Sequence, residues 1–190
     1  MNRLKRAAAV LLALLLTMSI TACGGDREGM SNPPDPNIQI LQVFAPKSSV
    51  GIVSTAVNAY GRYTDNITVQ ITYDDGAMLA SKIEAGYECD IYIAESADYL
   101  DWLDSNSTAD KNPNGNDCIL EDSRTDVFIG PATVYDEDGN EKTEDVTYTA
   151  AVIKTGNYPN ASKAFIEFLK DAAYDEADEA YETYGFTKIN

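Results

Sequence analysis

The chain has 190 residues, with 31 acidic and 14 basic side chains, and its formal net charge at pH 7 is −17. So acidic a protein is repelled by nucleic acid and by anionic lipid surfaces, so we expect neither as a partner. The sequence has no histidine, which removes the most common general base and the most common transition-metal ligand, and three cysteines are too few for a zinc site.

Residues 1–22 predict a signal peptide. Three basic residues precede an apolar run over Ala7–Met18, and this run is shorter than a bilayer span needs. The stretch Ile20-Thr21-Ala22-Cys23 follows, and it resembles the lipobox of bacterial lipoproteins. The resemblance implies cleavage before Cys23 and a lipid on its sulfur. The alternative is an ordinary secretory signal with an incidental cysteine.

Residues 23–37 predict a lipidated, flexible tether, because they are polar and rich in glycine and proline. Residues 38–190 follow as the body expected to fold. A lipid on Cys23 would hold this body on the extracellular face of the bacterial cytoplasmic membrane.

Predicted strands and helices alternate regularly from Ile38 to Asp104. This order predicts a parallel sheet with right-handed crossovers, in which ligands bind beyond the carboxyl ends of the strands. We expect strands at Ile38–Phe44, Ile67–Tyr73 and Ile91–Ala94, and helices over Ile52–Tyr60, Ala77–Ala85 and Ser96–Asp104.

The pattern changes after Trp102. Residues 103–145 contain no clear strand–helix–strand unit, and we interpret them as a reduced crossover region. Asp136–Asn140 predicts a hairpin tip because it contains an Asp-Gly pair. The remaining expected elements are strands at Thr133–Tyr135 and Val146–Ile153, then helices over Ala161–Lys170, with Asn160 as cap, and over Asp175–Tyr184.

The stretch Pro46-Lys47-Ser48-Ser49 stands where the first helix begins. A helix start presents free N–H groups and a partial positive charge, so a serine there either caps the helix or helps to bind an anion. The stretch also follows the carboxyl end of a predicted strand, which favours the anion.

Three motifs, in this order and spacing, carry a resemblance to a known family. They are Phe44-Ala45-x-x-Ser48, then Leu79-Ala80-x-x-Ile83-Glu84-Ala85-Gly86 followed by Cys89–Ala94, and lastly Ala161-x-x-Ala164-Phe165-x-x-Phe168-Leu169 with Tyr184-Gly185-Phe186. Together they resemble the molybdate-binding lipoproteins and periplasmic proteins that serve ABC importers.

The resemblance implies an α/β fold: a parallel-sheet lobe of the periplasmic-binding-protein (type II) kind, with C-terminal helices packed back on it. It also implies a solute-binding protein for molybdate, tungstate or a related tetrahedral oxyanion, with an ABC permease as partner and no cofactor, metal or catalysis. Neutral hydroxyl and N–H donors would hold the anion. The implied ligand-binding residues are Ser48, Ser49, Gly76, Ala77 and Tyr148.

The alternative function is a receptor that has lost most of its second lobe, and that serves as an interaction module or binds no ligand. The shortness of residues 103–145 favours it. Asp74 and Asp75 favour it too, because they place negative charge beside the expected anion.

Four carboxylates near the predicted strand ends, Asp74, Asp75, Asp90 and Glu95, also admit acid–base or metal chemistry. No nucleophile–base pair accompanies them, so solvated carboxylates and helix caps are the preferred interpretation. Cys89 and Cys118 either pair outside the cell or remain free thiols.

Overall fold

We describe a computed structural model of the chain over residues 38–135 and 138–189. The predicted signal peptide at residues 1–22, the proposed lipid site at Cys23 and the predicted tether over residues 23–37 lie outside the described residues. So do Asp136 and Glu137 of the predicted hairpin tip. Within the described ranges, no helix is both long enough and apolar enough to cross a membrane.

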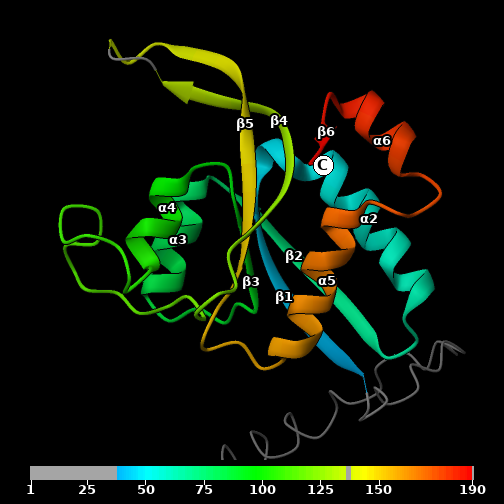
Figure 1. Ribbon diagram of the computed structural model, residues 1–190, viewed down its shortest axis with the longest axis horizontal. Helices are drawn as coiled ribbons and strands as arrows, with labels where there is room; N and C mark the ends of the chain where they lie inside the picture. The colour runs from blue at the N-terminus through cyan, green and yellow to red at the C-terminus, as the bar shows by residue number, and fades with distance from the viewer. Residues whose placement is uncertain (1–37, 136–137, 190) are drawn as a thin grey trace, which may run out of the picture. The chain divides into compact units, whose positions relative to one another are not determined.

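A six-stranded sheet with strand order β2-β1-β3-β5-β4-β6 lies at the centre (Figure 1). β1 pairs in parallel with β2 and β3, which confirms the parallel arrangement predicted for the first half of the chain. The other half is antiparallel, because β5 runs against β3 and β4, and β6 runs against β4. The strands are β1 (Gln39–Pro46), β2 (Ile67–Asp74), β3 (Ile91–Ala94), β4 (Thr125–Tyr135), β5 (Glu141–Val152) and β6 (Thr187–Lys188).

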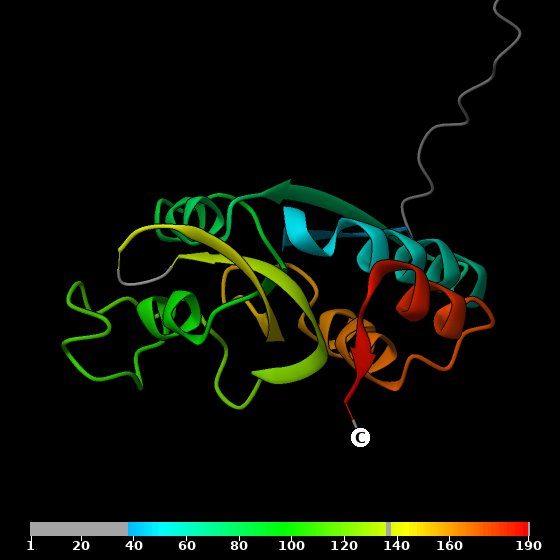
Figure 2. The same ribbon diagram turned by 90° about the horizontal axis from the view of Figure 1, so that it is seen from above.

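Helices cover both faces of this sheet. Figures 1 and 2 show α2, α5 and α6 together on one side and α3 with α4 on the other. The helices are the short 3₁₀ turn η1 (Lys47–Ser49), α2 (Val50–Tyr63), α3 (Gly76–Glu84), α4 (Ala97–Leu103), α5 (Pro159–Asp171) and α6 (Ala177–Tyr184).

The sheet separates two apolar cores, because successive side chains of a strand point to opposite faces. Along β1, Leu41 and Val43 pack into the core beneath α2, α5 and α6, whereas Phe44 packs into the core beneath α3 and α4. The C-terminal segment closes the first core. Phe186 packs edge-on against the Phe128 ring, with ring centroids 5.2 Å apart. The mixed α/β architecture, with its C-terminal helices packed back on the sheet, is therefore confirmed.

The predictions for the second half of the chain were less accurate. β4 and β5 are much longer than the expected strands at Thr133–Tyr135 and Val146–Ile153. The prediction missed Thr125–Ala132 of β4 and Glu141–Asp145 of β5. The second of these segments is polar and exposed, so no alternation marks it. Main-chain pairing with the end of β4 holds it extended. The outer half of this hairpin extends beyond the other strands (Figure 1).

The predicted cap at Asn160 is wrong. Tyr158 precedes the first turn of α5 and Pro159 opens the helix, so Asn160 already lies within it. Proline suits that position because its fixed φ angle matches the helix and its missing N–H would have no partner there.

A buried carboxylate clamps the amino-terminal edge of β3. Asp90 is fully buried, and its carboxylate accepts main-chain hydrogen bonds from Gln42 at 2.8 Å, Asn157 at 2.6 Å and Tyr158 at 3.2 Å. These bonds join β1, β3 and the start of α5. Asp90 is therefore a structural anchor, at the opposite end of β3 from the strand-end carboxylates with which the sequence grouped it.

We predict that Asp90→Ala lowers the free energy of unfolding by about 3 kcal/mol, because three partly buried N–H groups lose a charged acceptor. Denaturant unfolding of the purified chain measures the change. Asp65→Ala is the matched control, since Asp65 is exposed, and it should leave the stability unchanged. Equal stability of the two variants would contradict the anchoring role.

Candidate functional site

Three loops meet at the carboxyl ends of β1, β2 and β3. Together with the β4–β5 hairpin they line an open cavity of about 460 Å³, which we call the corner cavity. Ligands of α/β sheets bind beyond the carboxyl ends of the strands, so this is the expected place for a solute. The lining residues are Lys47, Ser48, Asp74, Asp75, Glu95, Thr133, Tyr135 and Glu141.

The two predicted serines have different surroundings. Ser48 is exposed and lines the corner cavity, and its side chain hydrogen-bonds with Glu95 and with Tyr148. Ser49 is fully buried, and its hydroxyl donates to the main-chain carbonyl of Pro46 at 2.8 Å. Ser48 is thus available to a ligand, while Ser49 shapes the turn that presents it.

The first amides of α3 already have acceptors from the chain itself. The Gly76 N–H donates to the Glu95 carboxylate. The Ala77 N–H donates to Asp75 Oδ1 at 3.0 Å, and the Met78 N–H lies 3.4 Å from the same oxygen. The donors predicted to hold a solute anion therefore hold two carboxylates.

Gly76 permits the close approach of Glu95. A Cβ atom at this position would lie 2.7 Å from Glu95 Oε1 and 2.8 Å from the Tyr99 ring, so a larger residue would displace both. Glycine thus allows an anionic group to reach the start of α3.

Glu95 is held imperfectly in this place. Its Oε2 atom is buried and has no hydrogen-bond partner among the described residues. Burial, followed by the negative charge of Asp75, raises the pKa of Glu95 to about 7. Hydrogen bonds from its own N–H, from the Gly76 N–H and from Ser48 act in the opposite direction. The carboxyl group therefore titrates close to neutral pH.

Tyr148 completes the arrangement from β5. Its ring is buried against Phe128 and Phe186, and its hydroxyl donates to the Pro131 carbonyl at 2.8 Å. Burial raises the pKa of Tyr148 to about 12, and its hydrogen bond with Ser48 opposes that rise. Because Ser48 has a single hydroxyl proton, it can donate to Tyr148 or to Glu95, but not to both at once.

The negative charge of Asp74 is largely compensated. Lys47 Nζ lies 3.1 Å from Asp74 Oδ1, and Lys82 Nζ lies 2.7 Å from Asp74 Oδ2. The hydrogen bond from Lys82 is the main reason that the pKa of Asp74 lies well below its ordinary value. Asp74 and Asp75 thus act as an ion-pair partner and a helix cap.

The structure also shows the state of the two cysteines and bears on the possibility of a metal site. Cys89 and Cys118 are both free thiols, and burial raises the pKa of Cys89. Within the described residues, no group of three or more His, Cys, Asp or Glu side chains is arranged to hold a metal ion.

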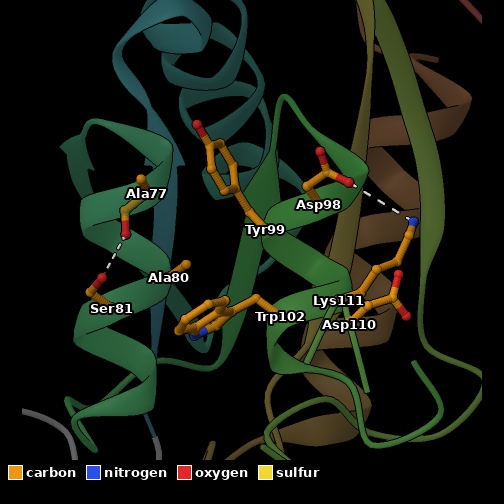
Figure 3. A pocket seen from close by; sticks show the side chains of 8 residues that line it. All are labelled: Ala77, Ala80, Ser81, Asp98, Tyr99, Trp102, Asp110 and Lys111. Atoms are coloured by element: carbon orange, nitrogen blue, oxygen red, sulfur yellow. Dashed lines mark hydrogen bonds and ion pairs between the residues drawn. The ribbon is translucent and has the colours of Figure 1, made fainter. Parts of the chain in front are cut away.

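A second cavity, of about 450 Å³, lies between α3 and α4. We call it the α3–α4 groove. Figure 3 shows Ala77, Ala80 and Ser81 on one side and the rings of Tyr99 and Trp102 on the other. The sequence analysis did not predict this groove, whose lining combines residues of α3 and α4 with Asp110 and Lys111 from the loop after α4. Its rings are held in place by packing, and the Trp102 indole N–H donates to Glu84 Oε2 at 3.1 Å.

No sequence-family profile matches the chain, and no curated protein is similar to it in sequence. Solved structures are similar in fold. The substrate-binding domain assigned to a molybdenum ABC transporter from Clostridium difficile aligns with a TM-score of 0.59 and 14% identity, over 80% of this chain and 99% of that one. The chain has a periplasmic-binding-protein fold.

Two other solved structures align with the present chain at the same TM-score of 0.59. The periplasmic molybdate-binding protein of Azotobacter vinelandii is 10% identical and aligns over 79% of this chain and all of its own. The sulfate-binding protein SubI of Mycobacterium tuberculosis is 9% identical and aligns over 80% of this chain and 88% of its own. These neighbours are binding proteins rather than enzymes.

We predict that Glu95→Gln stabilises the protein more at pH 8 than at pH 5. The pKa of Glu95 is raised in the folded state from 4.5 to about 7, so folding disfavours its charged form. The wild type therefore loses stability as the pH rises through this window, whereas the neutral glutamine does not. Denaturant unfolding at the two pH values measures the difference.

Glu167→Gln on the exposed surface of α5 is the matched control. The stability difference between the control and the wild type should be the same at both pH values. A Glu95→Gln effect that is equally independent of pH would show that Glu95 titrates as an ordinary surface carboxyl.

Proposed function

We propose that the protein is an extracellular solute-binding protein of an ABC importer, and that its ligand is molybdate or a related tetrahedral oxyanion. The fold of the neighbours supports the solute-binding role. The lipid on Cys23, the tether over residues 23–37 and the single lobe over residues 38–190 belong to the same proposal. They place the corner cavity outside the bacterial cytoplasmic membrane, within reach of a permease.

The observation that carries the proposal is the way in which the chain binds the Glu95 carboxylate. A hydroxyl from Ser48 and an amide from the start of α3 contact this anionic group, and the Tyr148 hydroxyl lies next to that of Ser48. Neutral dipoles of this kind can stabilise an anion without a counter-cation. The corner therefore has the donor chemistry that an oxyanion requires.

Calorimetric titration of the full-length chain with molybdate, tungstate and sulfate tests the proposal. We expect saturable binding of at least one of these anions, and about tenfold weaker binding by Ser48→Ala, which loses one donor to a charged group. Ser107→Ala, in the loop after α4, is the matched control and should bind like the wild type. The absence of binding heat with all three anions, together with an unchanged circular dichroism spectrum, would contradict solute binding by this chain.

A second candidate function is an interaction module that binds no solute. Two observations favour it. Carboxylates of the chain occupy the amides of α3, and no helix occurs among the described residues between 104 and 158, where a second α/β lobe would need several. Under this alternative, the three oxyanions leave the melting temperature unchanged, while the chain still co-purifies with the importer's permease.

A further inference from the structure

Two of the predicted ligand groups converge on Glu95 beside the corner cavity, and a third lies next to one of them. Ser48 and the Gly76 N–H contact its carboxylate directly, and Tyr148 shares the Ser48 hydroxyl. These groups come from η1, which follows β1, from α3, which follows β2, and from β5. The strand that leads to Glu95, β3, lies between β1 and β5 in the sheet. The side chain of Glu95 thus occupies the place of the proposed solute.

Secondary structure sets the backbone on both sides of Glu95, whereas its side chain has several rotatable bonds. Glu95 directly follows β3, and the next residue, Ser96, caps α4 by accepting a hydrogen bond from the Asp98 N–H at 3.2 Å. The glutamate side chain has several rotatable bonds and lines a cavity of about 460 Å³, so there is room for it to swing away from Gly76.

The contacts of Glu95 are also easily given up. One of its two oxygens has no partner among the described residues, and the charge of Asp75 lies nearby and repels it. A buried carboxylate with an unpaired oxygen carries a desolvation penalty that is relieved when the side chain moves into water.

We propose that Glu95 is a built-in competitor of the solute, and that its carboxylate must leave Ser48 and Gly76 before an oxyanion can bind there. This inference rests on the proposed function. It makes Glu95 a residue that sets affinity: removing its charge should strengthen oxyanion binding, whereas most substitutions in a binding site weaken it.

The test compares the full-length wild type with Glu95→Ala and Glu95→Gln in calorimetric titrations with molybdate and sulfate. We expect both variants to bind the oxyanion at least about tenfold more tightly than the wild type, because the hydrogen bonds to a charged competitor no longer have to be broken. Glu167→Gln is the control for an equal change in net charge. Adding Ser48→Ala to Glu95→Ala should abolish the gain, which ties it to the corner cavity.

A second readout is the dependence on pH, which a purely structural role of Glu95 would not produce. Protonation removes the competing charge, so the wild type should bind more tightly near about pH 6 than near about pH 8, and Glu95→Gln should lose this difference. The other groups that face Glu95 or line its cavity are Lys47, Asp74, Asp75, Tyr92, Tyr99, Tyr135, Tyr148 and Glu141. The pKa of Asp74 is lowered and those of the four tyrosines are raised, so these five do not titrate in that range.

The outcomes separate this inference from the proposed function. Wild-type binding that is as tight as, or tighter than, that of both Glu95 variants overturns the competitor role and leaves the proposed function standing. Binding by Glu95→Ala with a silent wild type supports the competitor role and contradicts solute binding by the unmodified chain. If no variant binds an oxyanion and the fold is intact, both the competitor role and the proposed function are overturned.

Discussion

The main-chain amides at the start of α3 impose the constraint on which the corner depends. The first N–H groups of a helix have no partner within the helix, and where they are buried they need an acceptor from elsewhere. Here Asp75 takes the Ala77 amide and Glu95 takes the Gly76 amide. The Glu95 carboxylate can approach this closely because Gly76 has no side chain. The corner therefore offers donors to an anion, and the group that occupies them is a carboxylate of the chain, whose pKa burial and the charge of Asp75 raise.

The sheet brings these groups together. Because β1, β2 and β3 run in parallel, the loops after their carboxyl ends lie side by side, and three short segments can share one cavity. Asp90 ties the opposite end of β3 to β1 and α5, which holds these strands in register while the loops stay free to carry polar groups. The β4–β5 hairpin supplies the remaining wall through Thr133, Tyr135 and Glu141.

The first half of the fold was predictable from the sequence because the first two strands are marked by alternation, the third by a short apolar run, and the helices by their spacing of apolar residues. The second half was not, since Glu141–Asp145 pair through main-chain atoms and carry no pattern in their side chains. Ser48, Gly76 and Tyr148 were predicted as ligand residues, and they do come together. Glu95 was considered only as one of several solvated carboxylates, because a residue that fills a site through a tertiary contact leaves no local signal. Asp90 was grouped with it on spacing alone, although it lies at the other end of its strand.

The most direct measurement is a nuclear magnetic resonance titration of the full-length Glu95→Ala variant with molybdate, in which backbone amides and the indole of Trp102, the single tryptophan of the chain, are observed together. Our account predicts that the amide signals of Ser48 and Gly76 shift in a saturable way while the Trp102 indole signal stays in place. Shifts confined to Trp102 and its neighbours would put the ligand in the α3–α4 groove, and they would contradict an anion site at the start of α3.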